Sequence, residues 1–96
     1  MEKDKVIFRK FSQGDIVALF PRIPSDLNGR LCESYMHVGQ HSAADPAIIT
    51  TTKPALPSEY ALLAKELRSI GYHLDIGKRI TESDDIAAKQ QWGHLK

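Results

Sequence analysis

Hydrophobic residues near the start of the chain are grouped in two segments that predict a pair of strands. Residues 6–11 (VIFRKF) and 15–20 (DIVALF) are rich in β-branched and aromatic side chains. The intervening residues 12–14 (SQG) predict a hairpin turn, because glycine adopts a positive φ at little cost. Since residues 16–20 are continuously apolar, we expect the second strand to be covered on both faces of its sheet.

A third strand is predicted from about residue 31 to residue 40, after a loop over residues 21–29 that contains prolines and an Asn-Gly turn signal. Side chains alternate across a strand, so the even-numbered positions share one face and the odd-numbered positions share the other. The even-numbered set contains Cys32 and most of the apolar side chains, and we expect it to face the core. The odd-numbered set is expected on an open face, and its members include Tyr35, His37 and His41.

The middle of the chain, residues 45–56, is predicted to be irregular. Its β-branched run at residues 48–52 favours a short edge strand, since the flanking prolines are incompatible with a central one. One helix is then predicted to begin at Pro57 and to end at Gly71, which suits a C-terminal cap. Its buried stripe, at helical spacing, consists of Tyr60, Leu63, Ala64, Leu67 and Ile70.

A last strand is predicted at residues 72–80, with His73 and Asp75 on its polar face. If that face is the open one and the strands are neighbours, His73 and Asp75 lie near His37 and His41. The sequence alone leaves the order of the strands open.

These elements predict an α+β fold with the order β-β-β-α-β, in which the main helix packs on one face of a mainly antiparallel sheet. The domain is expected to span residues 1–80. Residues 81–96 are expected to form a tail or a short C-terminal helix. In that tail Ser83 is the predicted N-cap, and two acidic residues at 84 and 85 favour a helix N-terminus.

The composition narrows the class of protein. A chain of 96 residues has room for one domain, and no apolar run approaches the roughly 20 residues that a membrane helix needs. A net charge of +1 predicts no general binding to nucleic acids and leaves a local basic patch open. Residues 1–5 mix both charge signs, unlike a signal peptide, and the lone Cys32 suits a reducing compartment, so we expect a cytoplasmic protein.

The segment from Tyr35 to Pro46 concentrates more hydrogen-bonding side chains than core packing alone requires. Arg79 adds a cation that can neutralise an anionic ligand, and Trp92 belongs to a residue type that is enriched at interfaces. The candidate binding residues are Tyr35, His37, Gln40, His41, Ser42, Asp45, His73, Arg79 and Trp92.

Metal and covalent chemistry are disfavoured by strand geometry. On one strand, His37 and His41 would be about 13 Å apart, too far to share an ion about 2 Å from each. Cys32 has the wrong parity to meet either histidine, and Ser42 lacks the Gly-x-Ser-x-Gly pattern that aims a nucleophile. We therefore expect no metal, no cofactor and no catalytic residue, with a small hydrolase as the least favoured function.

The chain also resembles a known family. The runs that carry the resemblance are residues 5–11 (KVIFRKF), 15–21 (DIVALFP), 34–41 (SYMHVGQH) and 53–55 (KPA). With these runs the chain resembles a family of small uncharacterised proteins found in bacteria, phages and mobile elements. The resemblance implies a phage or mobile-element setting, where small proteins often bind host factors or signalling nucleotides.

The resemblance covers roughly residues 5 to 80 and leaves the tail outside. Members of that family tend to carry a threonine-like cap before the proline that starts the helix, whereas this chain has Leu56 there. The departure affects the cap and leaves the helix itself expected.

The favoured function is a non-enzymatic binding protein that uses the open sheet face and residues 35–45. Its target is expected to be a host protein or a second copy of the chain. A homodimer is predicted from the double-sided apolar strand at residues 16–20 and from Trp92. The alternative is a sponge that holds a nucleotide or another anionic small molecule in a pocket beside His37 and His41.

Overall fold

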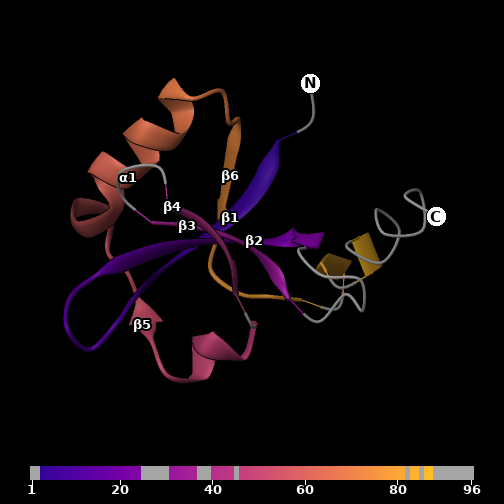
Figure 1. Ribbon diagram of the computed structural model, residues 1–96, viewed down its shortest axis with the longest axis horizontal. Helices are drawn as coiled ribbons and strands as arrows, with labels where there is room; N and C mark the ends of the chain where they lie inside the picture. Colours follow the sequence, from indigo (N-terminus) through magenta and orange to yellow (C-terminus); the bar gives the residue numbers. More distant parts are fainter. Residues whose placement is uncertain are drawn as a thin grey trace.

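The structure is a computed structural model that describes residues 3–24, 31–36, 40–44, 46–81, 83–84 and 86–87. These residues form a six-stranded sheet with one α-helix packed against it (Figure 1). The elements are β1 (Asp4–Lys10), β2 (Ile16–Pro24), β3 (Cys32–Met36), β4 (Gln40–Ala44), the 3-10 helix η1 (Pro46–Thr50), β5 (Lys53–Pro54), α1 (Pro57–Ser69) and β6 (Leu74–Gly77).

The strands lie in the order β4-β3-β2-β1-β5, and β6 also pairs with β1. All pairings are antiparallel except that of β6, which runs parallel to β1. β5 pairs with Arg9 and Lys10 near the end of β1, whereas β6 pairs with residues 4–7. The predicted α+β class and the mainly antiparallel sheet are confirmed, with β4, η1 and β5 as additional elements.

The predicted N-terminal hairpin is confirmed. The Phe11 N–H donates to the Asp15 carbonyl at 2.9 Å, and Gly14 has a φ of 102°, a backbone conformation that side chains disfavour. β2 is longer than predicted, because residues 21–24 continue the strand where the sequence indicated a loop. The register with β3 shifts between Phe20 and Pro24, and this irregularity accommodates the prolines.

The predicted single strand over residues 31–40 is wrong. β3 ends at Met36 and β4 begins at Gln40, and these two residues are partners in an antiparallel ladder. The chain therefore reverses direction between them. Period-2 alternation continues through both strands of such a hairpin, so the pattern alone does not reveal the reversal.

The β-branched run before β5 forms a 3-10 helix instead of the predicted edge strand. The hydroxyl groups of Thr50, Thr51 and Thr52 donate to the carbonyl oxygens of Ala47 or Ile48 at 2.8–3.1 Å. Threonine side chains that bond to nearby carbonyls stabilise a turn in competition with a strand. The edge strand lies at Lys53–Pro54, directly after the run.

The predicted helix is confirmed from Pro57, and Leu63, Ala64 and Leu67 are its buried residues. Gly71 follows it with a φ of 111°, as expected of a residue that ends a helix. Ile70 was predicted in the buried stripe, but 52% of its surface is exposed because the helix has already ended there. Among the described residues no helix is long and apolar enough to cross a membrane.

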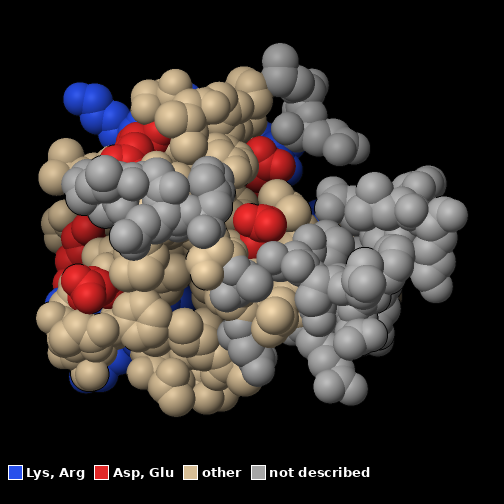
Figure 2. All heavy atoms as spheres, in the orientation of Figure 1, with Lys and Arg blue, Asp and Glu red and all other residues tan. Residues whose placement is uncertain are grey.

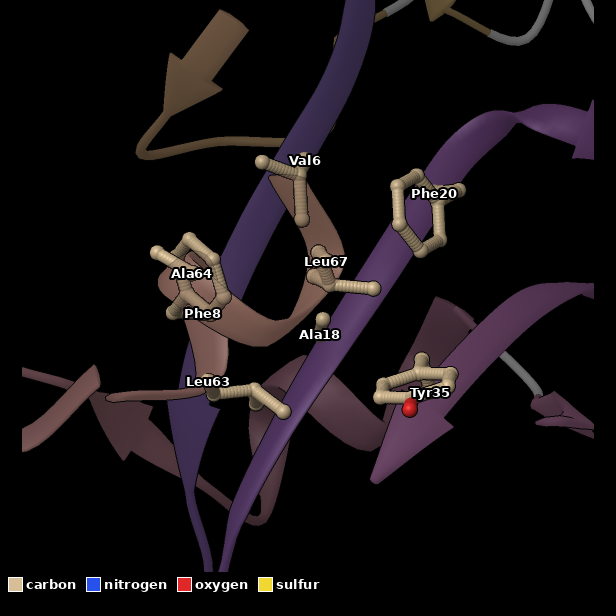
Figure 3. Close-up of a cluster of buried hydrophobic side chains, with 8 residues drawn as sticks. All are labelled: Val6, Phe8, Ala18, Phe20, Tyr35, Leu63, Ala64 and Leu67. Carbon is tan, nitrogen blue, oxygen red and sulfur yellow. The ribbon is translucent and has the colours of Figure 1, made fainter. Parts of the chain in front are cut away.

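Apolar clusters lie on both faces of the sheet. On the α1 side, β1, β2 and β3 contribute five side chains that pack against the three buried residues of the helix (Figure 3). On the other side, Ile7, Val17, Leu19 and Cys32 are buried, with Ile48 and Ile49 of η1 packed against them. β2 supplies both clusters, which confirms the predicted double-sided strand, and its cover comes from its own chain.

Candidate functional site

Tyr35 was predicted on an open face, and the structure corrects this prediction. Only 2% of its surface is exposed, and its ring lies in the cluster beneath α1 (Figure 3). Its hydroxyl donates to Glu66 Oε2 at 2.5 Å, which ties β3 to the helix. Tyr35 and Cys32 lie on opposite faces of the sheet, as their alternation predicted, but α1 covers the face that was expected to be exposed. Tyr35 is therefore a core residue whose hydroxyl group bonds to the helix.

The rest of the predicted binding segment is only partly within the described residues. His37, Asp45 and Trp92 lie outside them. Gln40 and His41 belong to β4, where His41 is the ladder partner of Tyr35. Ser42 is exposed, and its carbonyl oxygen accepts a hydrogen bond of 3.0 Å from Ser34 Oγ.

His73 does not lie beside the histidine segment. It directly precedes β6, whose partner is β1, and its carbonyl oxygen accepts a 2.6 Å bond from the Asp4 N–H. β4, which contains His41, stands at the opposite end of the strand order, with β3 and β2 between it and β1. The predicted neighbourhood of His73 and Asp75 with His41 is wrong for this reason. Arg79 is exposed, two residues after β6 ends.

The described side chains show where Cys32 lies and whether acidic, histidine and cysteine side chains gather as metal ligands would. Cys32 is buried in the cluster beneath η1, which confirms the prediction that it faces the core. In the part of the chain that the structure describes, no group of three His, Cys, Asp or Glu side chains is placed to hold a metal ion.

A first groove lies at the end of the sheet where the β1–β2 turn, β3 and α1 meet. It has a volume of about 430 Å³ and is lined by Gly14, Asp15, Ile16, Met36, Glu59, Leu62 and Leu63. Leu62 is 79% exposed on the helix, so the groove has an accessible apolar wall. Asp15 and Glu59 add negative charge, although Glu59 also pairs with Lys10. We call this the acidic groove.

A second groove lies where α1 ends and β6 begins. It has a volume of about 410 Å³ and is lined by Lys3, Arg68, Tyr72, His73 and Leu74. The Tyr72 ring stacks on Phe20 with centroids 5.0 Å apart, which anchors this wall to the core. Burial raises the pKa of the Tyr72 phenol, and the negative charges of Glu33 and Asp4 raise it further. We call this the basic groove.

The pKa of the Asp84 carboxyl group is strongly shifted, whereas the sequence indicated this residue only as one that favours a helix N-terminus. Its side chain is fully buried and accepts hydrogen bonds from Lys5 Nζ at 2.6 Å and Arg22 Nε at 2.7 Å. Burial alone raises the pKa of this carboxyl group, but the bonds from Lys5, Arg22 and the Thr81 N–H outweigh it and lower the pKa to about 2. The contacts join residue 84 to β1 and β2.

Thr81, rather than the predicted Ser83, caps this helical segment. The Asp84 N–H donates to Thr81 Oγ1 at 3.3 Å, and the Thr81 N–H donates back to Asp84 Oδ2 at 2.8 Å. Ser83 itself is helical. The signal was present in the sequence, since Thr-x-x-Asp fits the reciprocal capping pattern.

Arg9 is a second polar residue that the sequence argument missed. It is buried on the η1 side of β1, where Nε donates to Thr52 Oγ1 at 3.0 Å and Nη2 donates to the Ile49 carbonyl at 2.7 Å and to the Thr52 carbonyl. Desolvation lowers the pKa of this guanidinium group. Arg9 holds η1 and the residues before β5 against the sheet, so its role is structural.

Charge on the visible surface is dispersed. Figure 2 shows acidic side chains in separate small patches among uncharged atoms on one face of the described residues. The comparisons with known proteins add no relative: no family model, no curated protein and no solved structure matches this chain.

Proposed function

We propose that this chain is a non-enzymatic binding protein that takes up an extended segment of a host protein along the free side of β4. The observation that carries the proposal is the position and composition of this strand. Among the described strands β4 pairs with β3 alone, and its five residues, QHSAA, carry neither a fixed charge nor a proline. An edge strand that carries no charged residue and no proline can pair with a strand of another chain.

The opposite side of the sheet shows the contrast. There β5 and β6 both pair with β1, and β5 consists of Lys53 and Pro54. A lysine and a proline are common protections of an edge, because charge resists stacking and proline lacks the N–H donor. The two edges of this sheet therefore differ in their capacity to accept a strand.

The acidic groove supports the same proposal. Met36 lines it and is the ladder partner of Gln40, so the groove lies near the start of β4. Strands are spaced by about 4.8 Å, which lets a segment paired with β4 reach the groove within a few residues. The exposed Leu62 and the carboxylate of Asp15 favour a partner that carries a large apolar side chain close to a lysine or arginine.

The size of the interface favours a host segment over a second copy. Two β4 strands paired with each other would cover only five residues on each side, far below the roughly 1,200 Å² of stable interfaces, whereas a host segment can extend beyond β4 into the acidic groove. The apolar faces of β2, which motivated a homodimer, are covered within the chain. As part of the proposal the protein acts in the cytoplasm, in a phage or mobile-element setting.

A displayed library of random peptides tests the proposal without knowledge of the partner. We expect enriched peptides that combine β-forming residues with a large apolar residue next to Lys or Arg. Ser42→Lys places a charge on the edge strand and should abolish capture, whereas Ser69→Lys at the end of α1 is the matched control. Leu62→Ala should weaken binding about tenfold, in line with burial of one leucine side chain, and Leu56→Ala should not.

Sedimentation of the same variants separates the two kinds of partner. If the wild type is a dimer and Ser42→Lys is a monomer, the partner of β4 is a second copy of the chain and not a host segment. A strict monomer that enriches no peptide, or peptides that bind Ser42→Lys as tightly as wild type, would contradict the use of β4.

A further inference from the structure

We propose that the basic groove binds an organic monophosphate, a phosphate group carried on a small molecule with an uncharged body. The groove is independent of β4, because its lining comes from the residue before β1, the last turn of α1 and the approach to β6. Its volume of about 410 Å³ falls within the range of about 300–1,000 Å³ in which proteins bind organic molecules.

The charges that line the groove are cationic. Lys3 and Arg68 are both exposed, and within the described residues neither takes part in an ion pair. By contrast, Lys5, Lys10 and Arg22 each bind a carboxylate of their own chain. Two cations that converge on one groove without such a partner are positioned to bind an anion, and arginine suits phosphate geometry in particular.

The backbone beside Arg68 holds this arrangement in place. The N–H groups of Gly71 and Tyr72 donate to the carbonyl oxygens of Arg68 and Leu67 at 3.2 and 3.1 Å. Because these carbonyl oxygens already accept backbone hydrogen bonds, they do not draw the donor groups of Lys3 and Arg68 away from a bound phosphate. His73 is exposed on the groove wall, and its ring adds a hydrogen-bond donor for a phosphate oxygen.

The apolar and acidic residues around the groove determine which molecular body can accompany the phosphate group. Tyr72 and Leu74 are half-buried and supply apolar surface beside the cations. Asp4 and Glu33 lie close enough to Tyr72 to raise the pKa of its phenol, so negative charge is unfavourable on that side. A ligand with its charge concentrated at one end and an uncharged body at the other fits both conditions. A polyanion does not fit them.

Calorimetric titration with adenosine monophosphate at low ionic strength tests the proposal, with adenosine and inorganic phosphate as the two partial ligands. We expect the monophosphate to bind at least about tenfold more tightly than either, since each lacks one of the two groups of contacts. Arg68→Gln should raise the Kd about tenfold. Lys65→Gln, which removes an exposed cation from the same helix outside the groove, should leave the Kd unchanged.

Amide chemical shifts locate the binding. Perturbations confined to residues 3, 68 and 72–74 support the site, and they should remain in Ser42→Lys, which separates this inference from the proposed use of β4. Equal affinity for adenosine would overturn the role of the cations, and equal affinity for inorganic phosphate would overturn the organic body. Absence of heat and of shift changes at millimolar ligand, or an Arg68→Gln variant with unchanged Kd, would overturn the site.

Discussion

Two helical segments of this protein begin with the same local arrangement and differ in how it is completed. At the start of α1 the Glu59 carboxylate accepts the Leu56 N–H at 2.9 Å and pairs with Lys10 of β1. At the later segment Asp84 accepts the Thr81 N–H at 2.8 Å and pairs with Lys5 of β1. Each segment is thus tied to the same strand through an acid three residues beyond its cap.

The difference lies in burial and in the cap. Asp84 is fully buried, has a second cation in Arg22, and its backbone N–H donates to Oγ1 of Thr81. Glu59 remains partly exposed, and Leu56 has no side-chain acceptor, so only half of the cap forms. Ion pairs near bulk water contribute little to stability, whereas removal of one partner of a buried pair is costly. The same motif therefore has a large structural effect in one place and a small one in the other.

The largest expected effect is that of Asp84→Ala. This variant leaves Lys5 largely buried without its carboxylate and removes the cap contact to Thr81, so we expect the free energy of unfolding to fall by about 3 kcal/mol. Urea denaturation followed by circular dichroism measures it. Asp75→Ala, at an exposed aspartate of β6, is the control and should change stability by less than about 0.5 kcal/mol. If Asp84→Ala and Asp75→Ala reduced the free energy of unfolding equally, the buried Asp84 contacts would have no special effect on stability.

Acid should weaken the Asp84 contacts in a defined range of pH. The pKa of this carboxyl group is lowered from 3.8 to about 2 in the folded protein, so its contribution is complete above pH 4 and is lost as the pH falls toward 2. The expected loss from this group is about 2 kcal/mol. Denaturation curves of wild type and Asp84→Asn across this range should converge at the acidic end. Parallel curves would show that Asp84 does not carry the dependence.

Gly77→Ala should disturb the Asp84 contacts indirectly. A Cβ at Gly77 would lie 2.8 Å from Lys5 Cε, the far end of the side chain that binds Asp84, so the lysine must shift to make room. We expect a loss of about 1.5 kcal/mol, typical of a methyl group added in a tight space. The same substitution made in Asp84→Ala should cost less, because the displaced contact is already absent. An identical cost in both backgrounds would place its origin elsewhere.

Completion of the weaker cap should stabilise the protein. Leu56 has φ −79° and ψ 155°, the extended conformation of an N-cap residue, and its side chain is 61% exposed. Leu56→Ser supplies the missing acceptor with little loss of buried apolar surface, and we expect a gain of about 1 kcal/mol. Leu56→Ala is the control and should bring no such gain. Thermal denaturation of both variants decides whether the cap limits α1.

The smallest effect is expected from Glu59→Gln. Glutamine can still accept the Leu56 N–H, so only the charge interaction with the partly exposed Lys10 is lost. We expect a change in stability below that of Leu56→Ser, and it should vanish at about 1 M salt, where surface charges are screened. A loss as large as that of Asp84→Ala would show that exposure does not distinguish the two pairs.

The candidate site was predicted only in part because the decisive contacts are nonlocal. Strand parity correctly placed Tyr35 and Cys32 on opposite faces, but the sequence did not show that α1 covers one face and η1 the other. His73 was predicted as a candidate residue near the histidines of β4. The strand order places it in the basic groove instead. Lys3 and Arg68 gave no local signal, since each is an ordinary exposed cation until the fold brings them together.

Features that depend on short-range chemistry could be predicted from the amino-acid sequence. These are the α+β class, the hairpin around Gly14, the double-sided apolar strand, and the helix between Pro57 and Gly71. Backbone preferences and side-chain periodicity act over a few residues, so they are readable in the chain. The tertiary structure alone decided the reversal between β3 and β4, the pairing of β6 with β1, and the burial of Asp84 between Lys5 and Arg22. The pairing of β6 and the burial of Asp84 depend on contacts between residues up to 79 positions apart, which no local pattern encodes. The β3–β4 reversal joins residues that are close in the chain, but it leaves the alternation of side chains unbroken.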